Sequence, residues 1–231
     1  IAPIYPVYAY DAEGKKILDE NGQPIYDFGN GKYGTRAYGS NQNVVASSDA
    51  NQNQTINDNL TTRVGATITF LKDFQFQVNG GYDVANSANN TFQTPSFGDA
   101  QQSGGRSKKV RSRVQSFTIN ELLTWKRAFG DNHIDVLAGH ENYGLQVSGL
   151  SAEKTKFFSP TIPEFNNALI MESMSSSTDE YTIDSYFGRV NYDYADRYHL
   201  SASIRRGGSS RFHKDNRWGT YWSVGATWAA S

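Results

Sequence analysis

Hydrophobic and polar residues alternate along several stretches of this chain. From Phe74 to Asp83 the alternation is unbroken, and a period of two residues is the pattern of a β-strand with one apolar and one polar face. Aromatic residues eight positions apart mark both ends of three such stretches: Phe74 and Tyr82, Phe117 and Trp125, Tyr186 and Tyr194. Eight residues of tilted strand cover about 20 Å, close to the apolar band of an outer-membrane barrel between its two aromatic girdles. The pattern therefore predicts strands of a transmembrane β-barrel.

Composition agrees with such a barrel and excludes several other classes. Hydrophobic residues make up only 37% of the chain and the mean hydropathy is −0.62, which suits a barrel with a wet interior. The 22 basic and 23 acidic residues nearly cancel, so we expect no nucleic-acid partner. No cysteine is present for a disulfide framework or a thiolate metal site. The chain opens at Ile1 without a signal peptide, and we expect a processed or excerpted piece.

The alternation divides the chain into two parts. We expect residues 1–60 to form a polar extracellular loop region, in which Ile17-Leu18 and Pro24-Ile25-Tyr26 could make a small hairpin. Residues 61–231 are predicted to form antiparallel barrel strands, with long extracellular loops at 84–111, 148–181 and 207–216 and short turns between them. Short periplasmic turns and long extracellular loops are typical of bacterial barrels.

The strand count and one irregular strand refine this prediction. About seven strands are found, fewer than the roughly eight of the smallest single-chain bacterial barrels, so the sheet must continue beyond this chain. In the strand expected from about Asn132 to Val147 the apolar set changes phase after Ala138. This change predicts a β-bulge or the point where the strand leaves the membrane.

Polar residues on the inner side of the strands are candidates for lining the lumen or contacting a plug. The simpler interpretation, which we favour over substrate contact, is that they only hydrate the interior or pair with one another. They are Arg63, Gln75, Gln77, Asn79, Asp83, Arg189, Asn191, Asp193 and Arg205.

Aromatic residues in the expected loops are candidates for ligand contact, because an aromatic ring offers an apolar platform to a sugar. Such residues also often pack their own loop. They are Tyr38, Phe92, Phe97, Phe157, Phe158 and Phe165. The basic run from Arg106 to Arg113 could attract an anionic substrate or lipopolysaccharide phosphates, or could be a solvated loop.

No pattern of catalysis, cofactor binding or metal binding is found in the sequence. The histidines His133, His140, His199 and His213 lack metal-ligand spacing, and there is no Gly-x-Ser-x-Gly elbow. The run Gly207-Gly208-Ser209-Ser210 lies between two strands rather than before a helix, so it lacks the geometry of a phosphate cradle. We assign no catalytic, cofactor-binding or metal-binding residue, and an outer-membrane enzyme barrel has no candidate site.

Longer motifs carry a family resemblance. Ser185 to Tyr194 and Leu200 to Arg206 are followed by a motif whose members are Gly208, Ser209, Ser210, Arg211, Phe212, Asn216, Arg217 and Trp218. Together with Asn120–Trp125 and Val136–Glu141, these residues resemble SusC/RagA-type TonB-dependent transporters of the Bacteroidetes outer membrane. Family members usually carry Asp where Gly207 stands, which puts an ionic role of that position in doubt.

The resemblance implies a fold and a function. The expected fold is all-β, a partial transmembrane β-barrel of antiparallel strands from a larger barrel of about 22 strands that encloses a plug. The expected function is import of oligosaccharides or peptides across the bacterial outer membrane, with TonB, a SusD-like surface lipoprotein and outer-membrane lipid as partners. No enzymatic activity is expected.

A soluble β-sandwich that binds carbohydrate is the alternative from a different class. It predicts that the outward apolar residues pack against a second sheet, whereas a barrel predicts that they face lipid. They are Val64, Ile68, Val78, Val190, Leu200 and Val224. Burial of Phe76, Ile204 and Trp228 in a compact interior would likewise contradict the barrel.

Overall fold

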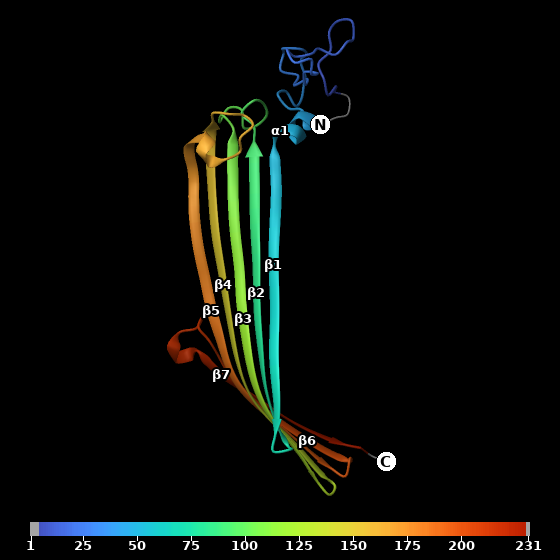
Figure 1. Ribbon diagram of the computed structural model, residues 1–231, viewed down its shortest axis with the longest axis vertical. Helices are drawn as coiled ribbons and strands as arrows, with labels where there is room; N and C mark the ends of the chain where they lie inside the picture. Colours follow the sequence, from blue (N-terminus) through green and yellow to red (C-terminus); the bar gives the residue numbers. More distant parts are fainter. Residues whose placement is uncertain (1–4, 230–231) are drawn as a thin grey trace. The chain divides into compact units, whose positions relative to one another are not determined.

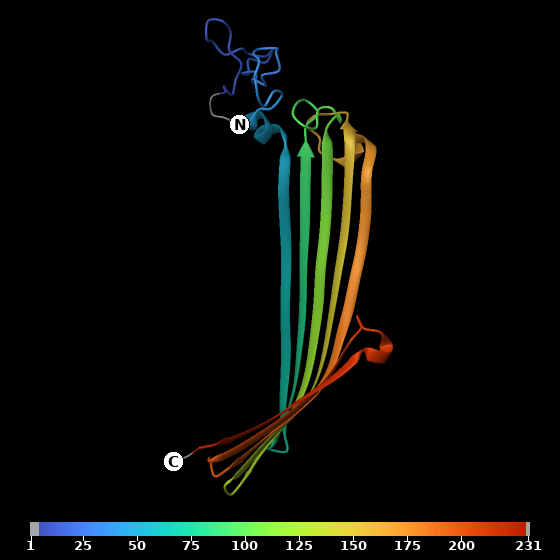
Figure 2. The same ribbon diagram turned by 180° about the vertical axis from the view of Figure 1, so that it is seen from behind.

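Seven strands form one antiparallel sheet in the computed structural model, which describes residues 5–229. The strands follow the order of the sequence, β1-β2-β3-β4-β5-β6-β7, and Figures 1 and 2 show β1 to β5 side by side from opposite sides. The elements are α1 (Val44–Ala50), β1 (Gln52–Phe70), β2 (Phe74–Gln93), β3 (Arg106–Phe129), β4 (Asn132–Phe157), η1 (Phe165–Asn167), β5 (Ala168–Tyr194), β6 (Tyr198–Ser209), η2 (Lys214–Asn216) and β7 (Trp218–Trp228). The prediction of an all-β, unclosed part of a barrel is confirmed.

Internal contacts divide the chain into two compact units. Unit 1 comprises residues up to Asn57, Ser87–Ser112 and Gly149–Ser177, and unit 2 comprises Asp58–Asn86, Arg113–Ser148 and the chain from Thr178. Strands β1 to β5 contribute residues to both units, whereas β6 and β7 belong to unit 2. No helix among the described residues is long and apolar enough to cross a bilayer.

The strands are longer than the alternation predicts, so the expected loop bounds were wrong. Instead of 84–111, the connection between β2 and β3 is 94–105, and instead of 148–181, that between β4 and β5 is 158–167. The connection between β6 and β7 is 210–217 rather than 207–216, and β1 begins at Gln52 inside the expected loop region. Backbone ladder bonds do not depend on side-chain polarity, so polar residues continue a strand wherever a neighbouring strand pairs with them.

The short turns of unit 2 have the backbone geometry that tight hairpins require. Leu71 and Lys72 have φ angles of 48° and 64°, and Ala195 and Asp196 have φ angles of 52° and 54°. Consecutive positive φ angles are typical of type I′ turns, whose twist matches that of the flanking strands. The second turn sets the register of β5 and β6, in which Tyr194 pairs with Tyr198.

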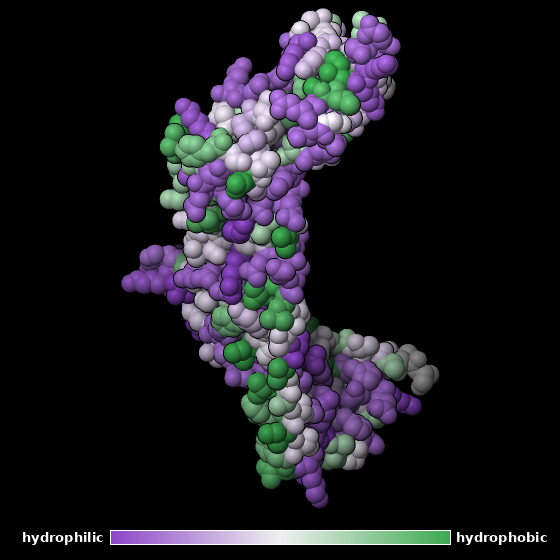
Figure 3. All heavy atoms as spheres, turned by 45° about the horizontal axis from the view of Figure 1, so that its top comes forward, coloured by the Kyte–Doolittle hydropathy of each residue, from purple (hydrophilic) through white to green (hydrophobic). Residues whose placement is uncertain are grey.

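One side of the strands in unit 2 is apolar and exposed, and we call it the apolar face. It bears Val64, Leu200 and Val224, whose exposed fractions are 70%, 51% and 73%. Phe76, Ile204 and Trp228 are exposed as well, and Figure 3 shows hydrophobic residues gathered on this part of the chain beside hydrophilic ones. Among the described residues no second sheet covers this face, which contradicts the β-sandwich alternative.

Aromatic rings of the apolar face form two rows. Next to the short turns, Phe70 stacks on Phe74, and Phe74 contacts Trp125 with 6.4 Å between the ring centroids. At the other end, Tyr186 contacts Trp218 at 6.3 Å. These rows lie where the sequence predicts the two girdles, and rings at that level suit the two membrane interfaces.

A bulge was one of two interpretations of the phase change after Ala138, and the contacts of β4 with β3 argue against it. On β4, His140 contacts Glu121 of β3, and Gly144 lies against Phe117 of β3. From the first contact to the second, β4 advances by four residues and the antiparallel β3 goes back by four. The two contacts fit the same β3–β4 register, so neither strand has an extra residue between them. The apolar residues after Ala138 therefore lie on the polar side of the sheet, and β4 has a left-handed backbone only at Lys156, with φ 59°.

Unit 1 contains the region before β1 and a small core. Bridges pair Tyr8 with Tyr26 and Leu18 with Pro24, so the segments expected to form a small hairpin do pair. Helix α1 was missed within a stretch expected to be a loop, and its N-cap is Asn43, whose side chain accepts bonds from two backbone N–H groups of the first turn. The core consists of Phe92, Phe157 and Ala168.

Candidate functional site

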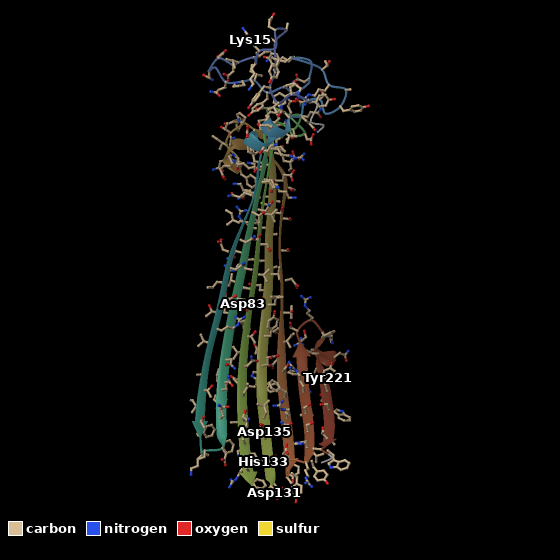
Figure 4. The ribbon with its side chains drawn as sticks, turned by 90° about the vertical axis from the view of Figure 1, so that its right-hand side faces the viewer. Lys15, Asp83, Asp131, His133, Asp135 and Tyr221 are labelled. Carbon is tan, nitrogen blue, oxygen red and sulfur yellow. The ribbon has the colours of Figure 1, made fainter. Side chains whose placement is uncertain are left out.

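The side of unit 2 opposite the apolar face carries paired charges, and we call it the polar face. Arg63 on β1 donates two hydrogen bonds to Asp83 on β2, at 3.0 and 2.9 Å between nitrogen and carboxylate oxygen. Figure 4 labels Asp83 midway along β2. A bidentate pair of this kind holds two neighbouring strands by geometry as well as by charge. These two residues thus satisfy each other, which is the simpler of the two interpretations that the sequence left open.

Arg205 on β6 bonds residues of two other strands on this face. Its guanidinium donates to Glu141 Oε1 at 2.8 Å and to Ser185 Oγ at 3.1 Å. It also lies over the ring of Phe187, its cross-strand partner, at 5.6 Å from the ring centroid. The guanidinium is half exposed, so donors remain available beside these partners.

A hollow of about 440 Å³ opens in the polar face around Arg205. Leu137 and Phe187 provide apolar surface there, and Tyr221 on β7, labelled in Figure 4, is 70% exposed. Arg189 and Ser203 also line the hollow. Exposed aromatic rings next to guanidinium groups can bind sugar rings, carboxylates or peptide side chains.

Sequence reasoning found only part of this hollow. Arg189 and Arg205 were among the predicted lining residues, whereas Leu137 and Tyr221 were not named as candidates. The position of Tyr221 could have been inferred, because antiparallel pairing of β6 and β7 places it opposite Arg205. Phe187 interrupts the polar alternation because Gly139 on β4 leaves room for its ring.

The other predicted lining residues lie on β2 and β5. Gln77 donates to Asn79 Oδ1 at 3.1 Å, and Asp193 bonds His199 at 2.5 Å. Strand alternation places the remaining residues on the same polar face: Gln75, Arg189 and Asn191.

The six aromatic residues expected in loops divide into three pairs. Phe92 and Phe157 lie on β2 and β4 and are buried against each other, with exposed fractions of 2% and 8%, so the expectation that they contact ligand from loops was wrong. Phe97 packs on Phe28 at 4.6 Å, and Phe165 lies beside the Lys109 ammonium group. Tyr38 and Phe158 are exposed and stay candidates for ligand contact.

The motif that begins at Gly208 builds the connection between β6 and β7. The Ser210 hydroxyl accepts a hydrogen bond from the Thr182 backbone N–H at 2.9 Å, and Arg211 bonds Asp179 at 2.6 Å. Trp218 covers Gly208, where an added Cβ would lie 2.8 Å from its ring. Phe212 is exposed, and Asn216 and Arg217 belong to the helical turn before β7. The motif therefore shapes a turn.

A charged cluster that sequence reasoning missed lies on the apolar face. His140 bonds Glu121 at 2.8 Å through Nδ1 and Asp184 at 2.6 Å through Nε2, and its ring stacks on Tyr186. The signal was Glu121, which interrupts an otherwise apolar set on β3. In the part of the chain that the structure describes, no three His, Cys, Asp or Glu side chains are arranged to hold a metal ion.

Comparison with known proteins points to one family. Residues 9–231 match the family described as "TonB dependent receptor-like, beta-barrel". The TonB-dependent receptor SusC of Bacteroides thetaiotaomicron is 31% identical over 160 residues, which are 69% of this chain and 16% of that protein. The TonB-dependent receptor P3 of Formosa agariphila is 28% identical over 167 residues, which are 71% of this chain and 16% of that protein.

Solved structures of the RagAB peptide importer have the same fold. In its "open-open" state the TM-score is 0.75 at 19% identity, over 88% of this chain and 24% of that chain. A second structure, of the RagAB peptide transporter, gives a TM-score of 0.73 at 20% identity, over 78% of this chain and 20% of that chain. The chain thus spans a quarter or less of the length of these relatives.

Proposed function

Because the chain belongs to the family of TonB-dependent receptor β-barrels, as a SusC/RagA-type segment in the bacterial outer membrane, we propose that the protein containing it imports oligosaccharides or peptides. The observation that carries the proposal is the match of residues 9–231 to a receptor barrel, together with a sheet that is apolar and exposed on one side and ion-paired on the other. In a barrel of this kind the apolar face meets lipid and the polar face meets the interior.

Within this proposal, the hollow around Arg205 is the part of the polar face that contacts substrate. Tyr221 and Phe187 offer rings for the apolar face of a sugar or for a peptide side chain. Arg205 and Arg189 offer N–H donors to hydroxyl, carbonyl or carboxylate oxygens. We assign the hollow a binding role.

The proposed partners follow from the family. TonB supplies the energy for import and a SusD-like surface lipoprotein captures substrate, as the resemblance of the Gly208 motif to SusC/RagA-type transporters implies. The RagAB neighbours are named as a peptide transporter, which supports including peptides beside oligosaccharides in the proposed substrates.

Uptake and binding by the full-length protein test the proposal. Cells expressing it should take up members of an oligosaccharide or peptide panel only when TonB is present. Tyr221→Ala should weaken binding of an imported compound about fivefold, in the range expected for one lost aromatic contact. Lys72→Ala, in an exposed turn, is the matched control and should bind normally. TonB-independent uptake would contradict the import mechanism, and unchanged binding by Tyr221→Ala would contradict the assignment of the hollow.

A further inference from the structure

A second concavity, of about 540 Å³, opens in unit 2 at the aromatic row that is distant from the short turns. Its lining includes Tyr82, Phe117, Gly144, Gln146, Glu180 and Ser210. Gly144 is essential to its depth, because an added Cβ would stand 2.2 Å from the Phe117 ring. The ring therefore lies against β4 at Gly144 and lines the groove.

The groove opens on the apolar face. Tyr82 is the last member of the alternating set that begins at Phe74, and Phe117 belongs to the set that ends at Trp125. In the proposed orientation this face meets lipid. The groove therefore adjoins the hydrocarbon-facing surface and lies at the level of the outer-leaflet headgroups. Its position thus selects a membrane component as the occupant.

The polar lining is a connected row of neutral and acidic groups. The Gln115 amide donates to Gln146, and Gln146 Nε2 donates to Glu180 Oε2 at 3.1 Å. Glu180 and Ser210 are exposed and keep free acceptor positions. Tyr82 and Phe117 are 41% and 38% exposed beside this row. Amides and carboxylates next to aromatic rings fit a hydroxyl-rich ring, whose C–H face stacks and whose hydroxyls donate and accept.

Cations lie beside the groove as well as at the level of the aromatic row: Arg113 donates to Gln115 Oε1 at 3.2 Å, and Arg206 lies on the same face. Arg206, the cross-strand partner of Tyr186, is exposed and lies 5.6 Å from the Trp218 ring centroid. A guanidinium between two interfacial rings is suited to bind a phosphate at the membrane surface. The nearby carboxylates of Glu121 and Asp184 are both bonded to His140, which limits their repulsion of such a phosphate.

We propose that this groove binds the sugar headgroup of an outer-leaflet glycolipid of the lipopolysaccharide type, with a phosphate of the same lipid at Arg206. The proposal rests on the orientation given under the proposed function, in which the apolar face meets lipid. The size of the groove is in the range of about 300–1,000 Å³ found for small-molecule sites, which is larger than a simple ethanolamine headgroup requires.

Retention of lipid by the full-length protein tests the proposal. The protein is reconstituted into phosphatidylethanolamine vesicles with or without rough lipopolysaccharide and re-extracted in mild detergent, and bound lipid is quantified by mass spectrometry. The double variant Gln146→Ala with Glu180→Ala should retain about tenfold less glycolipid and the same phospholipid, as loss of hydrogen bonds to a charged group predicts. Lys72→Ala, in an exposed turn, is the control, and a heat-dependent gel shift verifies folding. Glu180→Gln is the conservative second variant and should lose less.

Three outcomes would overturn the proposal: equal glycolipid retention by wild type and double variant, retention of phosphatidylethanolamine alone, or equally tight capture of the free core oligosaccharide in water. Import by the same variants separates this proposal from the proposed function, since it should stay normal when only the lipid site is lost. Absence of import by the wild-type protein, with its glycolipid retention intact, would count against the transport proposal alone. Quenching of Trp222 fluorescence by brominated lipid tests the orientation independently.

Discussion

The ring of Phe187 on β5 lies over the backbone of Gly139 on β4, so that a Cβ at Gly139 would stand 2.4 Å from two of its carbon atoms. Phe187 in turn supports the Arg205 guanidinium at 5.6 Å. A position without a side chain on one strand therefore allows a large ring on the next, and this ring forms apolar surface in the hollow of the polar face.

Gly139→Ala should destabilise the barrel by about 1–3 kcal/mol, because the added methyl group overpacks the contact with Phe187. Denaturant unfolding in detergent, followed by tryptophan fluorescence, measures the change. Gly149→Ala is the control, since its Cβ would meet only ordinary contacts at 3.8 Å. In the background of Phe187→Ala the Gly139→Ala cost should largely disappear, and equal costs in both backgrounds would show that the ring is not responsible.

Phe157→Ala should loosen the small core of unit 1 at a cost of about 3 kcal/mol, because it removes the edge-to-face contact with Phe92 and leaves a cavity. The neighbouring Phe158→Ala removes a ring that is 75% exposed and should be nearly neutral. Limited proteolysis of the 158–167 connection reports the difference. Equal cleavage of the two variants would contradict the assigned core.

Replacing residues 96–103 by a short Gly-Ser linker should leave membrane insertion intact, because these residues lie outside β2 and β3. It should also expose the region near Asn41 to protease, because Gly98 N–H and the Gln101 side chain both bond Asn41. Deleting the whole of 84–111 removes paired residues of both strands and should block assembly. A gel shift after heating scores insertion, and normal assembly of the larger deletion would show that the strand ends are dispensable.

Tyr26 should ionise only at unusually high pH, since its hydroxyl donates to the Asp49 carboxylate and this bond raises the pKa of Tyr26 to about 12. A raised phenol pKa means that the folded state favours the neutral form. The resulting stabilisation is fully present below the unfolded pKa of about 10 and is lost as the pH rises through the folded value. The difference in ultraviolet titration between wild type and Tyr26→Phe isolates this group. Asp49→Asn should move the transition to lower pH, and an unmoved transition would exclude the carboxylate as the cause.

The local pattern of the sequence was enough to predict the strands of unit 2, the face on which each side chain lies, and the tight turns. Alternation from Phe74 to Tyr82 and from Tyr186 to Tyr194 assigns each side chain to a face, because successive side chains of a strand point in opposite directions. The stretch from Tyr186 to Tyr194 also lies within a family motif, so the barrel class was accessible without coordinates.

Only the tertiary structure decided where the strands end, which polar residues pair and which aromatic rings are buried. Residues 84–93 and 168–181 read as loops because their side chains do not alternate, yet neighbouring strands satisfy their backbone groups and keep them extended. Phe92 and Phe157 are 65 positions apart, and no local pattern brings them together. The sequence by itself determined on which face each side chain lies, since this depends on a period of two within one strand. The hollow around Arg205 and the groove at Gly144 arise from contacts between strands, so only the register in which the strands pair could place them.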